Sequence, residues 1–166
     1  MATSLPKWIE KPHHRELWRR PWTVPSDPRK AADFKRLLLK HNHLSPHFTL
    51  AEAACHDAAR TPVPRGLLDQ AQGHAFNLER LRHELGDVSL PILSWYRTDA
   101  HNDAVEGASE SRHLKADGTD FTVATVQRIG TAKFDRAAEK VFANGGFGRY
   151  PSGSRHVDSR GSRARW

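Results

Sequence analysis

Between residues 26 and 86, apolar side chains recur every three or four positions, which is the spacing of α-helices. The first helix is predicted to start at Ser26 or Asp27, because Pro28 suits a first helical turn; its stripe is Phe34, Leu37, Leu38 and His41. Thr49 and Glu52 have the spacing of a capping box, so a second helix begins there and ends before Pro62. A longer helix, ended by Gly86, turns one face inward: Ala71, Ala75, Leu78, Leu81 and Leu85.

After Gly86 the pattern changes to short apolar runs with alternating polarity. Residues 88–96 and 117–126 are predicted strands, and Pro91 in the first favours a position at a sheet edge. A helix is predicted over 131–144, followed by two short strands on either side of a turn at 151–154. The expected fold class is α+β, with N-terminal helices first and then a small, mostly antiparallel sheet with one inserted helix.

The 166 residues suit one compact domain with an N-terminal appendage. Residues 1–27 hold four prolines, three tryptophans and many cations, which predicts a basic Trp/Pro-rich arm ahead of a folded domain at 28–166. The tryptophans of this arm either pack on the domain or dock to a partner. The longest aliphatic run is Leu37–Leu39, so no membrane span is expected, and the N-terminus lacks the apolar segment of a secretory signal.

The formal net charge is +7, and the basic residues gather at both ends. Residues 1–30 carry seven basic and three acidic side chains, and residues 149–166 carry five and one. Such a balance favours a polyanionic partner, either nucleic acid or a phosphate-rich cell wall. The chain has no recognisable recognition helix or aromatic-interleaved strand motif, which argues against nucleic acid.

Cysteine usage limits the kinds of metal site that are possible. Cys55 is the only cysteine, so the chain has no internal disulfide and no all-thiolate zinc site, and its setting favours a small buried thiol over a nucleophile. A metal must therefore be held by histidines and carboxylates. His13-His14 and the cluster His41, His43 and His47 have no carboxylate at ligand spacing and are weak candidates.

Three polar features fall in the second half of the chain. His113, in Ser111-Arg112-His113, is followed seven positions later by Asp120 at the start of an apolar strand. His156 lies in Arg155-His156-Val157-Asp158, and Arg97 ends the run Ser94-Trp95-Tyr96-Arg97. Neutral imidazole and carboxylate are preferred zinc ligands, and catalytic zinc sites use three protein ligands with a fourth position left for water. Spacing alone is weak support, because the chain has eleven histidines.

The order and context of these motifs are more specific. The chain resembles the zinc D-Ala-D-Ala carboxypeptidases and related murein endopeptidases, whose fold is shared with lysostaphin-type and hedgehog-type domains. The resemblance is strongest over residues 48–166 and rests on Phe48-Thr49-Leu50-Ala51-Glu52, Asn77-Leu78, Ser94-Trp95-Tyr96-Arg97, Ala100-His101-Asn102, Gly107, Ser111-Arg112-His113, Asp120, Gly146-Phe147-Gly148-Arg149-Tyr150 and His156-Val157-Asp158.

The resemblance implies a Zn²⁺ ion held by His113, Asp120 and His156. It also implies that Arg97 binds a carboxylate of the peptide substrate, which suits a planar guanidinium with two parallel donors. Ser111 is expected beside the metal, with a hydrogen bond to substrate. Asp158 is expected either to orient a ligand or to act as the general base.

Three positions depart from the family pattern. Ala116 stands where the family usually has glycine, which is a mild change. Many relatives have Glu or Asp as the base three residues before the last histidine, and here that residue is Gly153. Ser154 stands where some relatives have a further histidine. The base therefore remains open between Asp158 and a carboxylate from elsewhere in the chain.

The function expected from the resemblance is hydrolysis of peptide bonds in bacterial peptidoglycan, as a D-Ala-D-Ala carboxypeptidase or a murein endopeptidase acting on stem peptides. The cell wall lies outside the cytoplasm, so we expect delivery by a phage, as an endolysin released through a holin or as a virion component. Residues 1–27 could then dock to tail proteins. The alternative is a non-catalytic, zinc-containing module that binds the cell wall or a tail protein.

Overall fold

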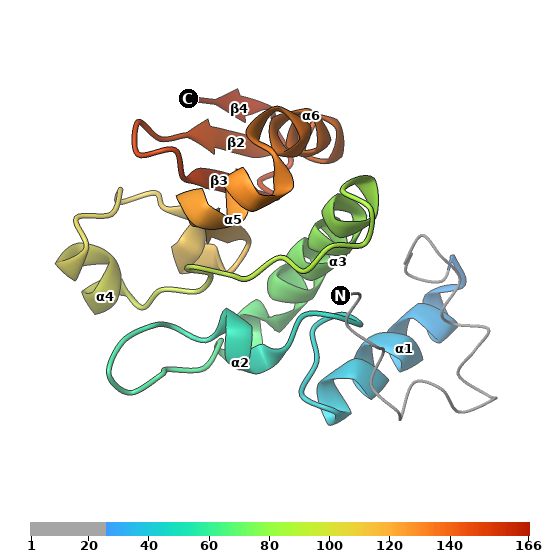
Figure 1. Ribbon diagram of the computed structural model, residues 1–166. Helices are drawn as coiled ribbons and strands as arrows, with labels where there is room; N and C mark the ends of the chain where they lie inside the picture. The colour runs from blue at the N-terminus through green and yellow to red at the C-terminus, as the bar shows by residue number, and fades with distance from the viewer. Residues whose placement is uncertain (1–25) are drawn as a thin grey trace.

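A computed structural model of the protein describes residues 26–166, so most of the predicted arm at 1–27 lies outside the described part (Figure 1). The helices are α1 Pro28–Lys40, α2 Leu50–Ala53, η3 Arg65–Leu67, α3 Leu68–Glu84, α4 Asp99–Ala104, η4 Arg112–Lys115, α5 Val123–Ile129 and α6 Thr131–Val141. The strands are β1 Gly118–Phe121, β2 Gly146–Arg149, β3 Arg155–Asp158 and β4 Ala164–Arg165. This arrangement confirms the predicted α+β class.

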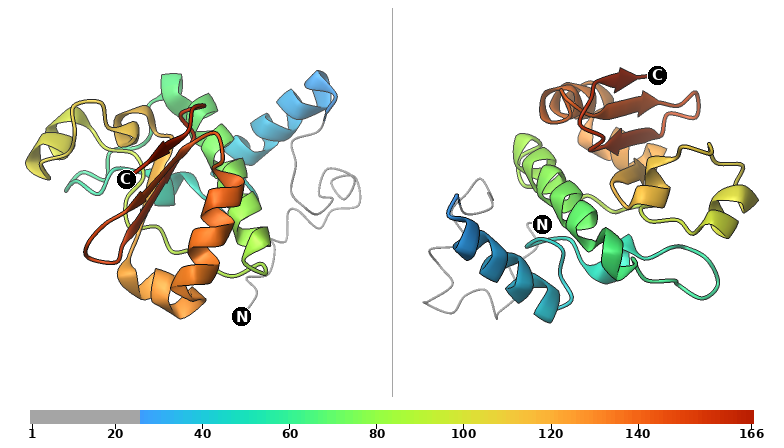
Figure 2. Two further views of the ribbon diagram at one scale, coloured as in Figure 1. Left: turned by 90° about the horizontal axis from the view of Figure 1, so that it is seen from above. Right: turned by 180° about the vertical axis from the view of Figure 1, so that it is seen from behind.

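Within residues 26–166 the sheet has four strands in the order β1-β3-β2-β4. β3 pairs antiparallel with both β1 and β2, whereas β4 pairs parallel with β2. Helices α3 and α6 lie on one side of the sheet, and the segment that contains α4 lies on the other (Figure 2). No helix among these residues is both long and apolar enough to cross a membrane.

Local capping determines where the first two helices begin, as the sequence predicts. The Asp27 carboxylate accepts hydrogen bonds from the backbone nitrogens of Arg29 and Lys30 at the start of α1. At α2, the Thr49 hydroxyl accepts from Glu52 N, and the Glu52 carboxylate accepts from Thr49 N, which completes the predicted capping box. Cys55 is fully buried.

The covered face of the sheet forms the core with α3 and α6. Val157 of β3 lies opposite Thr119 of β1 and Phe147 of β2, and all three are fully buried. His74 of α3 reaches this row, with its Nε2 2.8 Å from Thr119 Oγ1 and its Nδ1 2.7 Å from Ser159 Oγ. Since side chains alternate along each strand, Asp120 and His156 lie on the opposite, more open face.

One predicted strand is wrong, and another is wrong in part. Residues 88–96 form no strand, and their only ladder pairing among the described residues is a bridge between Ser94 and Asp120. Pro91 has no backbone N–H to donate to a longer ladder. Beyond Ser94 the backbone approaches η4, where Trp95 O accepts from His113 Nδ1 and Arg97 N donates to His113 O. In 117–126 the strand stops at Phe121, because the Thr122 hydroxyl caps α5 by accepting from Thr125 N.

The basic C-terminal end is largely neutralised by acidic side chains. Asp135 and Glu139 of α6 lie beneath the sheet and form ion pairs with Arg149, Arg155, Arg163 and Arg165. Arg160 pairs instead with Asp158. These pairs link α6 to the strands, so the positive charge at this end serves contacts within the fold as well as any approach to a polyanion.

Candidate metal centre

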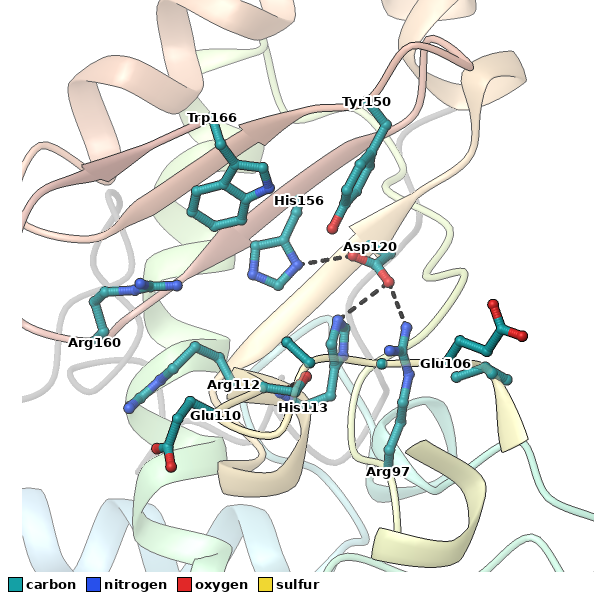
Figure 3. A pocket seen from close by; sticks show the side chains of 14 residues that line it. Arg97, Glu106, Glu110, Arg112, His113, Asp120, Tyr150, His156, Arg160 and Trp166 are labelled. Atoms are coloured by element: carbon teal, nitrogen blue, oxygen red, sulfur yellow. Dashed lines mark hydrogen bonds and ion pairs between the residues drawn. The ribbon is translucent and has the colours of Figure 1, made fainter. Parts of the chain in front are cut away.

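Three elements bring His113, Asp120 and His156 together. His113 lies on η4, Asp120 on β1 and His156 on β3, and all three are buried. One nitrogen of each imidazole and one oxygen of the carboxylate lie within 4.8 Å of one another. Figure 3 shows the three side chains converging on one point.

The sheet register positions two of these residues. Asp120 and His156 are directly opposite each other in the antiparallel β1–β3 pair, so their side chains share a face. The bridge from Ser94 to Asp120 ties the 94–97 segment to β1, and Trp95 O accepts a hydrogen bond from His113 Nδ1 at 2.6 Å. The Ser94-Trp95-Tyr96-Arg97 run therefore connects the first histidine to the aspartate.

Each imidazole has an outer partner that determines which nitrogen carries the proton. His113 Nδ1 faces the Trp95 carbonyl, and His156 Nε2 lies 3.1 Å from Asp158 Oδ2. A carbonyl and a carboxylate can only accept, so both of these nitrogens must donate. In the neutral rings, His113 Nε2 and His156 Nδ1 then present lone pairs inward, the arrangement typical of metal-binding histidines.

These inward groups need a cation between them. His113 Nε2 is 3.1 Å from Asp120 Oδ2, and His156 Nδ1 is 2.8 Å from Asp120 Oδ1. Two imidazole lone pairs and a carboxylate repel one another unless a proton or a metal ion is shared among them. Two imidazoles and one carboxylate are a common ligand set for catalytic zinc, so the residues present fit that ion.

The pKa shifts of His113 and Asp120 agree with this ligand set, because a metal needs a neutral imidazole and an ionised carboxylate. Burial lowers the pKa of His113, although Asp120 opposes the shift. Burial acts in the same direction on the pKa of His156, but hydrogen bonds to Asp120 and Asp158 outweigh it and raise that pKa. For Asp120, burial favours a higher pKa, yet the two imidazoles hold it well below its ordinary value. Asp120 therefore stays ionised, as a metal ligand must be.

Asp158 is placed to orient His156 rather than to take up protons. It is fully buried, and its carboxylate accepts from Gly146 N, from N, Nε and Nη2 of Arg160, and from His156 Nε2. Burial acts to raise the pKa of Asp158, but the bonds from His156 and Arg160 hold it far below its ordinary value. A general base works best with a pKa near the working pH, so this environment favours the orienting role.

Arg97 and Ser111 border the three central residues. Arg97 Nη2 donates to Asp120 Oδ2 at 2.7 Å, and its Nε donates to Ser94 Oγ at 3.0 Å. The Ser111 hydroxyl accepts from His113 N at 3.4 Å, so it caps η4 in addition to facing the cavity. Ala116 has a φ of 56°, in the left-handed region, which explains the glycine that the family prefers there.

A cavity of about 690 Å³ opens over the centre. Its wall includes His113, Asp120, His156, Arg97 and Ser111, whereas Asp158 is not among the described residues that line it. Several other wall residues had no role predicted from the sequence: Glu106, Glu110, Arg112, Tyr150, Arg160 and Trp166. These residues lie near the centre because of the register of the sheet and the path of the loops, and a local sequence motif indicates neither.

A scan against family models matches residues 46–158 to the peptidase M15 family. The chain belongs to this family. No curated protein matches the chain. Membership confirms the resemblance drawn from the motifs, and it makes the chain a metallopeptidase of a zinc-dependent family whose members act on peptidoglycan.

Proposed function

We propose that this M15 peptidase is a zinc-dependent D-Ala-D-Ala carboxypeptidase, with cleavage of murein cross-links as the second candidate. One observation carries the proposal. His113 and His156 each donate one ring N–H outward, to Trp95 O and to Asp158, and both turn the other ring nitrogen toward Asp120 in the wall of an open cavity. In this proposal His113 Nε2, Asp120 and His156 Nδ1 hold the ion. When bound, zinc supplies a Lewis acid that activates water and polarises the carbonyl group under attack.

The position of Arg97 favours the carboxypeptidase. Its guanidinium lies 2.7 Å from Asp120, a proposed ligand, and two contacts hold it in place. A carboxylate bound to Arg97 would thus lie close to the reacting bond, as in a peptide cut one residue before its C-terminus. The size of the cavity supports the second candidate, since it leaves room for more of a cross-linked substrate.

Mass analysis of digested muropeptides separates these two activities. Purified protein with zinc is incubated with monomeric pentapeptide muropeptides and with cross-linked dimers. The carboxypeptidase proposal predicts loss of one terminal alanine from the pentapeptide, and the endopeptidase predicts conversion of dimers to monomers. If neither substrate changes mass, the catalytic proposal fails.

Glu106 and Glu110 are our candidates for the proton acceptor. Along the described residues, the acidic side chains that line the cavity are Asp120, Glu106 and Glu110. Asp120 is the proposed ligand, and Asp158 is buried behind His156. Many relatives have their general base at the position that is Gly153 here. In this chain the base would then come from the loop that precedes His113.

A non-catalytic zinc module is the alternative, favoured by Gly153 in place of the usual acid. Such a protein would bind wall peptides and leave their mass unchanged. The same digest with and without a chelator distinguishes the two functions, because only the peptidase gives a product that depends on zinc.

We also propose phage delivery, as a holin-released endolysin or as a virion component that contacts tail proteins through residues 1–27. The composition of that segment, rich in tryptophan, proline and cations, supports docking. Mass spectrometry of purified phage particles tests this: a virion component is present in particles, and an endolysin is found only in the lysate.

A further inference from the structure

Trp166 is held against the proposed metal ligand His156. Gly148 lies opposite His156 in the β2–β3 pair, and a Cβ built on Gly148 would come within 2.5 Å of the Trp166 ring. The glycine therefore lets the indole lie close to the sheet. The ring centroids of Trp166 and His156 are 5.4 Å apart, with an interplanar angle of 41°.

Backbone and side-chain contacts fix this indole although it is 46% exposed. Trp166 O accepts from Arg149 N at 2.7 Å, and Trp166 N donates to Phe147 O at 3.4 Å. The Arg160 guanidinium lies 5.2 Å from the ring centroid and is itself anchored by Asp158. The exposed part of the ring is therefore a fixed wall of the cavity.

Tyr150 forms the neighbouring wall. Its hydroxyl points toward Asp120, and the indole nitrogen of Trp166 points toward Tyr150, on the side of the centre opposite Arg97 (Figure 3). Burial and the nearby Asp120 raise the pKa of Tyr150, although Trp166 opposes this shift. A phenol is protonated at neutral pH, so the Tyr150 hydroxyl can donate a hydrogen bond.

We propose that the Tyr150 O–H binds the carbonyl oxygen of the scissile peptide bond, and that the Trp166 Nε1–H, directed at the phenol, holds Tyr150 in place for this contact. Water adds to the carbonyl carbon, the C–N bond breaks, and the proton released by water ends on the leaving amine. Negative charge develops on the carbonyl oxygen during the addition, and donors aimed at that oxygen stabilise the transition state more than the bound substrate. This inference rests on the proposed peptidase function. The family match ends at residue 158 and does not include Trp166.

The test compares wild type with Tyr150→Phe and Trp166→Phe in zinc-loaded protein. Tyr96→Phe is the matched control, because it removes the only other phenol of the chain, which does not line the cavity. Two readouts are needed: turnover of the muropeptide that wild type cleaves, and calorimetric binding of a phosphinate analogue of D-Ala-D-Ala. A phosphinate mimics the tetrahedral geometry and charge of the transition state.

For Tyr150→Phe we expect kcat and phosphinate affinity to fall together, by roughly 10- to 100-fold, with KM and zinc content nearly unchanged. Trp166→Phe should lose affinity in the same direction, and Tyr96→Phe should match wild type. Wild-type turnover and phosphinate affinity in Tyr150→Phe would overturn the inference and leave the peptidase function intact. Absence of phosphinate binding by wild type would also overturn it, whereas absence of turnover alone contradicts the proposed function.

Discussion

Asp158 Oδ2 lies 3.1 Å from His156 Nε2, on the edge of the ring that faces away from Asp120. This contact makes Nε2 the donor and leaves Nδ1 to face the proposed metal position. Arg160 holds the carboxylate from the other side. The tautomer of His156 thus depends on a residue that does not line the cavity.

Asp158→Asn should weaken zinc binding by roughly 10- to 100-fold, because the amide is a poorer acceptor for His156 Nε2–H and carries no charge. Competition with a chromophoric chelator measures the affinity. Asp135→Asn is the control, since it removes an ion-paired carboxylate from α6 on the covered side of the sheet. Equal zinc affinity in Asp158→Asn and wild type would refute the orienting role.

Gly146→Ala should damage the same contact through the backbone. A Cβ at Gly146 would come within 2.0 Å of Asp158 Oδ2, so the carboxylate must move. We expect lower stability and weaker zinc binding. Gly73→Ala in α3 is the matched control, because a Cβ there meets nothing within 4 Å, and it should raise stability by about 1 kcal/mol. Urea unfolding and zinc titration check both variants, and normal zinc binding by Gly146→Ala would contradict the account.

His74 predicts a pH dependence of stability. Burial lowers the pKa of His74 to about 3, so it is neutral in the folded protein and titrates near 6.5 when unfolded. Its contribution is complete above pH 6.5 and is lost as pH falls from 6.5 toward 3. In chelator-treated protein, His74→Gln should reduce the loss of unfolding free energy between pH 6.5 and 4.5 by on the order of 2 kcal/mol. Parallel curves for the two proteins would count against this.

The two glutamates of the cavity wall give a test for the proton acceptor. Glu106→Gln and Glu110→Gln keep the size of each side chain and remove its charge. We expect one of them to lower kcat by roughly 10²-fold or more, without loss of zinc, and the other to stay near wild type. Steady-state cleavage of muropeptides measures this. If both variants keep wild-type kcat, the acceptor lies elsewhere.

Helices α1, α2, α3 and α6 and the proposed ligand set could be predicted because their signals are local, whereas α4 and α5 were not predicted. The Asp27 and Thr49 side chains cap their helices by accepting from backbone nitrogens two or three positions away, and the motifs around His113 and His156 are contiguous. The strand predicted over 88–96 is wrong. Alternation of apolar and polar residues cannot show that the backbone groups of Trp95 and Arg97 form hydrogen bonds with His113 instead of with a neighbouring strand.

The cavity walls could not be predicted for a related reason. Trp166 reaches His156 through the parallel pairing of β4 with β2, and that pairing joins residues far apart in the sequence. Likewise, Asp158 is a candidate base from the sequence alone, because no local motif indicates that Arg160 and Gly146 donate hydrogen bonds to its carboxylate. Register and burial decide both roles.

The zinc content of purified protein, measured together with muropeptide cleavage in wild type and His113→Ala, tests the central claim most directly. The account predicts about one zinc per chain in wild type, and loss of both zinc and cleavage in the variant, with the helical signal in circular dichroism retained. Wild type that binds no zinc, or a His113→Ala variant that cleaves as fast as wild type, would contradict it.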